Sequence, residues 1–161
     1  MLKWFMSILI LPFNVAVIIP ALILYFSNYN YRAPDTIFLI AGICILIAGL
    51  FLAIWTMVLF NNVGKGTLAP WNPPENLVVE GPYRYVRNPM IIGILMILFS
   101  EYWLLDAVQI LLWAVLFFII NNIYFRIYEE KQLKKNFGED YIKYKKNVPM
   151  WIPRLTPWKL Q

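Results

Sequence analysis

Residues 36–60 read TIFLIAGICILIAGLFLAIWTMVLF, a run of 25 residues without one charged side chain. At 1.5 Å of rise per residue, a helix of this length exceeds the roughly 30 Å hydrocarbon core of a bilayer. Gly42 and Gly49 lie within the run, and glycines are the positions where a second helix approaches most closely. The run therefore predicts a membrane-spanning helix that packs against a neighbour.

The composition of the whole chain agrees with a membrane environment. Of its 161 residues, 61% are hydrophobic and only 14% are charged. A water-soluble domain of this length would have too few polar residues to cover its surface. We therefore expect a single membrane domain over residues 1–161, because nothing in the length calls for a second one.

A second uncharged run precedes this one, from Trp4 to Phe26. It is long enough to span the bilayer and exceeds the apolar core of a usual signal peptide, the alternative reading of such an N-terminus. Pro12 and Pro20 should kink the helix, so neighbouring helices must satisfy the freed carbonyls.

Two further apolar runs follow a loop that is rich in glycine and proline. They cover residues 89–105 and 107–125, and Glu101 and Asp106 mark the turn between them. The sequence therefore predicts an all-α polytopic bundle of four transmembrane helices, spanning about residues 4–26, 36–60, 89–105 and 107–125.

The basic residues indicate how this bundle is oriented. Cytoplasmic loops hold the excess of Lys and Arg, and four spans put both termini on one side. In that arrangement thirteen of the fourteen basic residues lie on the side of the termini, and only Arg32 lies on the other. We expect cytoplasmic termini, a cytoplasmic loop over 61–88 and a cytoplasmic tail over 126–161.

The tail should continue the fourth helix as a cytoplasmic extension. No helix breaker occurs from Arg126 to Lys135, and Gly138 is the expected end of the helix. The apolar residues of the extension recur at helical spacing, which suits a stripe that lies on the membrane or on the bundle. That stripe consists of Leu133, Phe137, Tyr141 and Tyr144.

Several kinds of chemistry are excluded by what the chain lacks. It has no histidine, so histidine acid–base and triad chemistry are absent. Its single cysteine, Cys44, excludes an internal disulfide and a cysteine–histidine metal site. Any chemistry must use carboxylates, arginine, tyrosine, backbone groups or a cofactor.

One polar cluster lies just before the third span and reads GPYRYVRNP over residues 81–89. Asn88 is placed to cap the helix that Pro89 begins, and the free N–H groups of such a helix end favour a bound anion. The alternative is that Arg84 and Arg87 only fix the topology and that Asn88 is only a cap.

A second cluster lies at the end of the fourth span and contains Arg126, Glu129 and Glu130. Arg126 and Glu130 are four residues apart and can pair on one helix face. An exposed pair of this kind has little energetic value and implies no function. At the mouth of a cleft, however, its carboxylate can meet the positive sulfonium or ammonium group of a ligand.

Together the two clusters resemble the isoprenylcysteine carboxyl methyltransferase family, within a superfamily that includes phospholipid N-methyltransferases. The similarity extends from about Gly64 to Arg154. Its features are LVVEGPYRYVRNPM over 77–90, then Glu129-Glu130, Phe137-Gly138, Tyr141, Tyr144 and Val148-Pro149.

This resemblance implies that S-adenosyl-L-methionine is held between the two clusters. The implied cofactor-binding residues are Leu77, Val78, Tyr83, Arg87, Asn88, Pro89, Met90, Ile91 and Glu129, and the implied catalytic residues are Glu130 and Arg126. Family members often read Arg-His-Pro-x-Tyr, so Asn88 and Ile91 replace a histidine and a tyrosine here. Arg126 would contact the substrate, and Glu130 would be the essential glutamate.

The resemblance also implies a lipophilic methyl acceptor that enters from the bilayer. We expect an isoprenylcysteine-like carboxylate, with phospholipid ethanolamine nitrogen and a small thiol or lipid as alternatives. A non-catalytic assembly protein, whose basic tail binds anionic membrane lipids, is the alternative from another class. We expect the inner (cytoplasmic) membrane of a prokaryote, no metal ion and no nucleic-acid partner.

Overall fold

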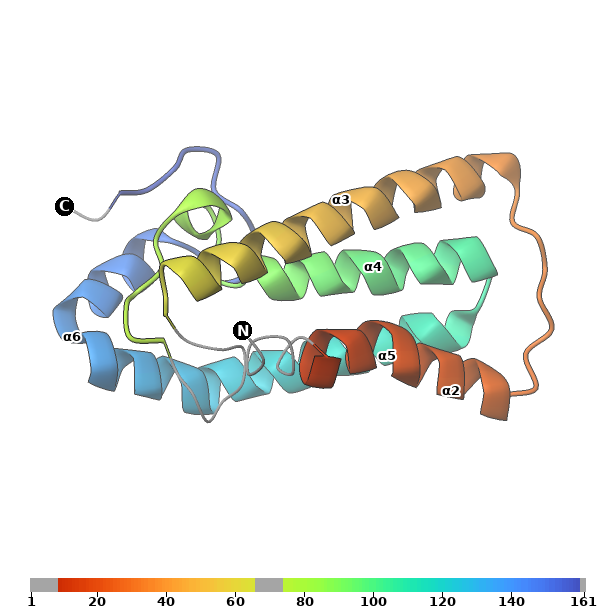
Figure 1. Ribbon diagram of the computed structural model, residues 1–161, viewed down its shortest axis with the longest axis horizontal. Coiled ribbons are helices and arrows are strands. Elements are labelled where there is room, and N and C mark those ends of the chain that lie inside the picture. Colours follow the sequence, from red (N-terminus) through yellow and green to blue (C-terminus); the bar gives the residue numbers. More distant parts are fainter. Residues whose placement is uncertain (1–8, 66–73, 160–161) are drawn as a thin grey trace.

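A computed structural model describes residues 9–65 and 74–159 of the chain, and the secondary structure in this part is entirely helical (Figure 1). The expected all-α class is therefore confirmed. The elements in chain order are η1 (Leu9–Ile18), α2 (Ile19–Phe26), α3 (Thr36–Asn62), η2 (Gly81–Arg84), α4 (Pro89–Leu105), α5 (Val108–Tyr124), η3 (Phe125–Glu129) and α6 (Glu130–Asn147).

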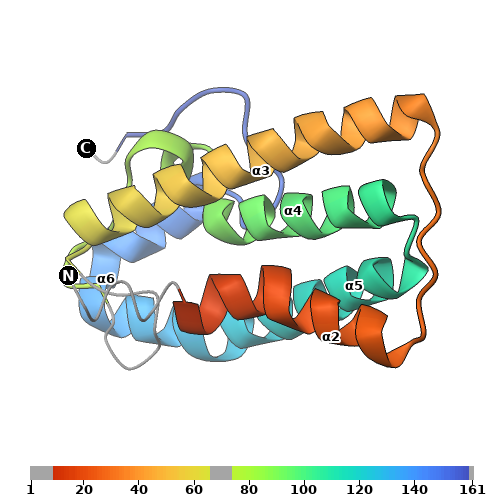
Figure 2. The same cartoon turned by 45° about the vertical axis from the view of Figure 1, so that its right-hand side comes forward.

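Helices α3 and α4 lie side by side along most of their length (Figures 1 and 2). Glycine makes this close approach possible at Gly49 and Gly93. A Cβ atom added to Gly93 would lie 2.8 Å from the backbone nitrogen of Ala53 and 3.0 Å from the carbonyl oxygen of Gly49. The approach predicted at the glycines of the 36–60 run is confirmed, since small residues let the two backbones meet.

The hairpin between α4 and α5 turns where the sequence indicated. Asp106 adopts the left-handed conformation with φ of 49°, which ends α4 and reverses the chain. Ala107 and Ile110 are buried directly after the turn. The Tyr29 hydroxyl donates a hydrogen bond to the carbonyl of Leu105, so the loop after α2 is tied to this turn.

The N-terminal segment packs against the bundle as η1 and α2. Its hydrogen bonding is of the π type around Pro12 and becomes α-helical from Ile19, next to Pro20. A proline lacks the N–H that a continuous helix needs, which explains the change of pattern. The Trp113 indole nitrogen donates to the Val15 carbonyl at 3.0 Å. The start of the expected span 4–26 lies outside the described residues.

Within the described residues, two helices are long and apolar enough to cross a membrane, namely α3 and the continuous helix Val108–Asn147. Pro12–Phe26 and Pro89–Leu105 are apolar but shorter. Large apolar side chains face outward, for example Ile37, Phe51 and Leu112, which are 78%, 65% and 65% exposed. Such surfaces are typical of helices that face lipid. The chain is therefore a helical membrane protein, and the number of four crossings remains a prediction.

The helix that begins as α5 continues through η3 into α6. Gly138 interrupts it with φ of 52° and ψ of −126°, as the sequence indicated, but the helical segment resumes and ends at Asn147. The apolar stripe of this segment covers the bundle end rather than the membrane. Tyr141, Tyr144 and Val148 are buried there, together with the partly buried Leu77, Val79, Leu133, Phe137 and Trp158.

Candidate functional site

A pocket lies where the segment before α4 meets η3 and α6. Four parts of the chain build it: the end of α3, residues 74–88, η3 with the first half of α6, and residues 141–150 beyond Gly138. Its lining residues are Phe60, Pro74, Asn76, Leu77, Val78, Tyr83, Arg87, Asn88, Phe125, Glu129, Glu130, Leu133, Phe137, Tyr141, Tyr144 and Met150.

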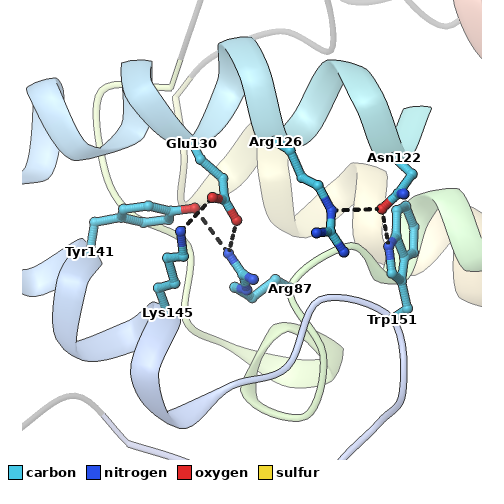
Figure 3. Close-up of polar contacts among 7 residues, drawn as sticks. All are labelled: Arg87, Asn122, Arg126, Glu130, Tyr141, Lys145 and Trp151. Atoms are coloured by element: carbon cyan, nitrogen blue, oxygen red, sulfur yellow. Dashed lines mark hydrogen bonds and ion pairs between the residues drawn. The ribbon is translucent and has the colours of Figure 1, made fainter. Parts of the chain in front are cut away.

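Arg87 crosses this pocket from the segment before α4. Its backbone N–H donates to the carbonyl of Pro149 at 2.9 Å, which fixes the segment against the tail. Its Nη1 donates to Glu130 Oε1 at 2.8 Å and to the Tyr141 hydroxyl oxygen at 3.2 Å (Figure 3). Arg87 therefore joins the first predicted cluster to the second.

Glu130 is held on both of its carboxylate oxygens. Oε1 accepts from Arg87, and Oε2 accepts from the Lys145 ammonium group (Figure 3). Partial burial by itself would raise the pKa of Glu130, but the hydrogen bonds and positive charges of Lys145 and Arg87 together lower its pKa. Glu130 is therefore a fixed anion at neutral pH.

The neighbouring carboxylate of Glu129 has the opposite environment. Glu129 lines the pocket and is half-buried, and no ion pair or hydrogen bond to its carboxylate is found in the described part of the chain. Burial, and then the negative charge of Glu130, raise the pKa of Glu129 to about 8. Two adjacent carboxylates are thus driven to different protonation states by their surroundings.

Tyr83 and Tyr144 form the floor beside these charges. The Tyr144 hydroxyl donates to the backbone carbonyl of Tyr83 at 2.7 Å, and both side chains are buried. Burial raises the pKa of both phenols, so both stay neutral. This contact fastens the end of α6 to η2.

Arg126 lies outside this network. Its Nε donates to Asn122 Oδ1 at 3.2 Å, and Asn122 Oδ1 also accepts from the Trp151 indole nitrogen at 3.0 Å (Figure 3). The four-residue spacing would allow Arg126 to pair with Glu130, but in this structure Glu130 pairs with Arg87 and Lys145 instead. The π pattern of η3 explains the difference, because the wider turn shifts residues four apart out of alignment.

A family model described as phospholipid methyltransferase matches residues 37–140, a range that contains both clusters. The chain belongs to this phospholipid methyltransferase family. The resemblance to membrane methyltransferases seen in the sequence is therefore confirmed.

Among curated proteins, methanethiol S-methyltransferase 2 of Bradyrhizobium diazoefficiens is 33% identical over 76 residues. The match covers 45% of this chain and 27% of that protein, so the chain corresponds to only part of its relative. No solved structure matches the chain.

In this member of the phospholipid methyltransferase family, most of the residues predicted for cofactor binding come together. Six of them line the pocket, and so does Glu130. The six are Leu77, Val78, Tyr83, Arg87, Asn88 and Glu129.

The remaining predicted residues lie elsewhere. The first turn of α4 contains Pro89, Met90 and Ile91. This turn packs into the core of the helix bundle, where Ile91 is only 7% exposed. Arg126 is exposed and does not line the pocket. Asn88 stands at the N-cap position of α4, but its side chain makes no capping hydrogen bond, so it is available to the pocket.

Sequence reasoning missed Lys145 and gave Tyr141 only a packing role. Tyr141 belongs to the apolar stripe, and Lys145 follows it by four residues on the same helix face. That spacing is a usable signal only when the turn at Gly138 is known to fold the end of α6 back over the pocket. Without that turn, Lys145 reads as one more basic residue of the tail.

Proposed function

We propose that this chain is an integral membrane methyltransferase that uses S-adenosyl-L-methionine in the pocket between η2, η3 and α6. The observation that carries the proposal is the junction of Arg87 with Glu130, which brings two motifs 43 residues apart into one pocket. The matched family range contains both motifs. When bound, the cofactor supplies a methyl group already activated by the positive charge of its sulfur.

The charges of the pocket fit such a ligand. Glu129 and Glu130 offer negative charge to a sulfonium and an ammonium group, while Arg87 offers positive charge to a carboxylate. Arg87 Nε is buried and has no hydrogen-bond partner within residues 9–65 and 74–159. A buried unsatisfied donor of this kind indicates a missing acceptor, and a ligand carboxylate is one.

The apolar part of the lining suits the adenosine end. Leu77, Val78 and Phe137 provide apolar and aromatic surface next to Tyr83. The enclosed space measures about 60 Å³, which is room for a few water molecules. A nucleoside-sized ligand therefore requires the end of α6 to move away from residues 77–83.

An apolar groove supplies a route for a lipophilic acceptor. It measures about 460 Å³ and is lined by Ile45 of α3, Ile92, Leu95, Met96 and Phe99 of α4, and Leu111, Ala114, Val115 and Phe118 of α5. The ring centroids of Phe118 and Trp151 are 5.0 Å apart. Those of Trp151 and Phe125, which lines the pocket, are 6.0 Å apart. These ring contacts connect the wall of the groove to the wall of the pocket.

We infer that the acceptor is a lipophilic or small apolar nucleophile, with a thiol as the first candidate. The curated relative is named as a methyltransferase of the small thiol methanethiol. The isoprenylcysteine-like carboxylate expected from the sequence and the ethanolamine nitrogen of a phospholipid remain alternatives. In this proposal Glu130 orients the reacting groups through its fixed charge, and Arg126 receives any acidic group of the acceptor at the edge of the site.

The experiment is a transfer assay with purified protein in detergent and S-adenosyl-L-methionine labelled in the methyl group. Alkyl thiols, a prenylcysteine and phosphatidylethanolamine are offered separately. We expect label in the thiol product, and label only in prenylcysteine or phospholipid would replace the thiol by that acceptor. A non-catalytic membrane protein would label none of them and would not bind the cofactor.

A further inference from the structure

We propose that Glu129, and not Glu130, accepts the proton that the methyl acceptor loses. This proposal rests on the proposed function and deepens it, because only an acceptor that carries a proton, such as a thiol or an amine, needs this group. A carboxylate acceptor is already ionised at neutral pH and needs no base.

Glu130 is poorly suited to take a proton. Arg87 occupies its Oε1 and Lys145 its Oε2, so a proton would have to displace a cation. The same contacts favour the ionised form of Glu130. Glu130 therefore serves as a permanent negative charge that holds the pocket together.

Glu129 has the features that Glu130 lacks. It faces the same pocket, it is half-buried, and no cation is paired with it in the described part of the chain. Its protonated form is favoured by burial and by the adjacent Glu130, and its pKa of about 8 lies close to the working pH of a cytoplasmic enzyme. The titratable and charged groups that line the pocket with Glu129 are Tyr83, Arg87, Glu130, Tyr141 and Tyr144. The charge of Glu129 also acts on Tyr124, and Lys145 is paired with the neighbouring Glu130.

A positive charge entering the pocket must change the protonation of Glu129. A sulfonium nearby favours the carboxylate over the acid, so Glu129 loses its proton to solvent when the pocket receives the charged ligand. The carboxylate is then ready as a base at the moment when the acceptor needs one. Glu129 thus couples the charge of the ligand to the availability of the base.

The chemical balance of the step is complete. A thiol acceptor forms a new sulfur–carbon bond to the methyl group, while the bond between that methyl group and the donor sulfur breaks. The S–H proton of the acceptor moves to the Glu129 carboxylate, and the electron pair of the broken bond stays on the donor sulfur, which becomes neutral. With that positive charge gone, the proton affinity of Glu129 rises again, so the proton stays on Glu129.

The first test measures protons released on binding and needs no turnover. Isothermal calorimetry at pH 7 in two buffers of different ionisation enthalpy gives the proton count for S-adenosyl-L-methionine and for its neutral-sulfur product, S-adenosyl-L-homocysteine. Wild-type protein should release more protons with the first ligand, and the difference should approach one. Glu129→Gln should remove this difference, and Glu139→Gln, which changes an exposed carboxylate of α6 outside the pocket, should retain it. Equal counts for both ligands in wild type, or an unchanged difference in Glu129→Gln, would overturn the proposal.

The second test asks whether an acceptor that is already ionised rescues the variant. With an alkyl thiol, Glu129→Gln should lower turnover by about 100-fold, the usual scale for one general base. With an aromatic thiol, which is largely ionised at neutral pH, the loss should shrink to a few-fold. An equal loss with both thiols would assign Glu129 a merely structural role.

The two proposals fail in different ways. If neither ligand binds, the proposed function itself is wrong and the role of Glu129 falls with it. If both ligands bind with equal proton counts, the cofactor site stands and only the role of Glu129 is wrong. Glu129→Asp, which keeps a carboxylate, covers the case in which Glu129→Gln does not fold, since it should retain part of the difference.

Discussion

The guanidinium of Arg87 lies 2.8 Å from the carboxylate of Glu130 and joins the segment before α4 to the start of α6. Both side chains are largely hidden from solvent, with 11% and 15% of their surfaces exposed. The spacing in the sequence allows Arg126 to pair with Glu130, but in the structure the partners of Glu130 are Arg87 and Lys145. The ion pair of Glu130 with Arg87 is therefore formed between distant segments rather than along one helix.

Replacing Glu130 by Gln should lower methyl transfer by roughly 100-fold or more, because the fixed charge that orients the site is lost. Arg126→Ala should instead raise the apparent KM more than it lowers kcat, since Arg126 lies at the exposed edge. Steady-state kinetics with the true acceptor measure both. A folded Glu130→Gln protein with near wild-type turnover would contradict the site assignment.

The stability of the folded protein should depend on pH through Glu129. Its folded-state pKa is raised from 4.5 to about 8, so the folded protein binds a proton that the unfolded chain has lost. This contribution is fully present below about pH 4.5 and disappears as the pH rises through 8. Thermal unfolding in detergent should therefore give a Tm that falls between pH 5 and pH 8 more steeply in wild type than in Glu129→Gln. Parallel curves for the two proteins would contradict the raised pKa.

The packing of α3 on α4 should depend more on Gly93 than on Gly42. Gly93→Ala places a methyl group 2.8 Å from a backbone atom of α3 and should destabilise the protein by about 1–3 kcal/mol. Gly42→Ala is the matched control, because its new methyl group meets the movable side chain of Leu104. Thermal unfolding of the two variants measures the effect, and equal losses would show that the backbone approach is not decisive.

The distribution of basic residues predicts that both termini face the cytoplasm. Thirteen of the fourteen Lys and Arg residues lie on that side in a four-span arrangement. A green fluorescent protein fused to either terminus should fluoresce, whereas a phosphatase fused within residues 27–35 should be active. An active phosphatase at the C-terminus would overturn both the topology and the cytoplasmic site.

Much of the bundle could be predicted because its signals are local. The uncharged run over 36–60 indicates α3, and the polar residues around Asp106 indicate the hairpin turn. The course of the chain after Gly138 could not be predicted in the same way. Gly138 signals a break, but only the tertiary contacts of Tyr141 and Tyr144 decide that the following helix folds back over the pocket.

The residues of the candidate site were predictable in part, and their pairing was not. The motif resemblance gathered Leu77, Tyr83 and Glu129, which do line one pocket. The partner of Glu130 was not predictable, because the spacing rule assumes a regular α-helix and η3 has a π pattern. Ile91 was assigned to the cofactor by its place in the motif, yet its side chain is buried in the core of the helix bundle.

Direct binding of the cofactor tests the central claim. Calorimetry with purified wild-type protein in detergent should detect one site for S-adenosyl-L-methionine and one for its demethylated product. Substitution of a pocket residue, such as Tyr83→Ala, should weaken this binding, while substitution of the exposed Lys159 to Ala should leave it unchanged. Absence of binding to folded wild-type protein at millimolar ligand would contradict the account.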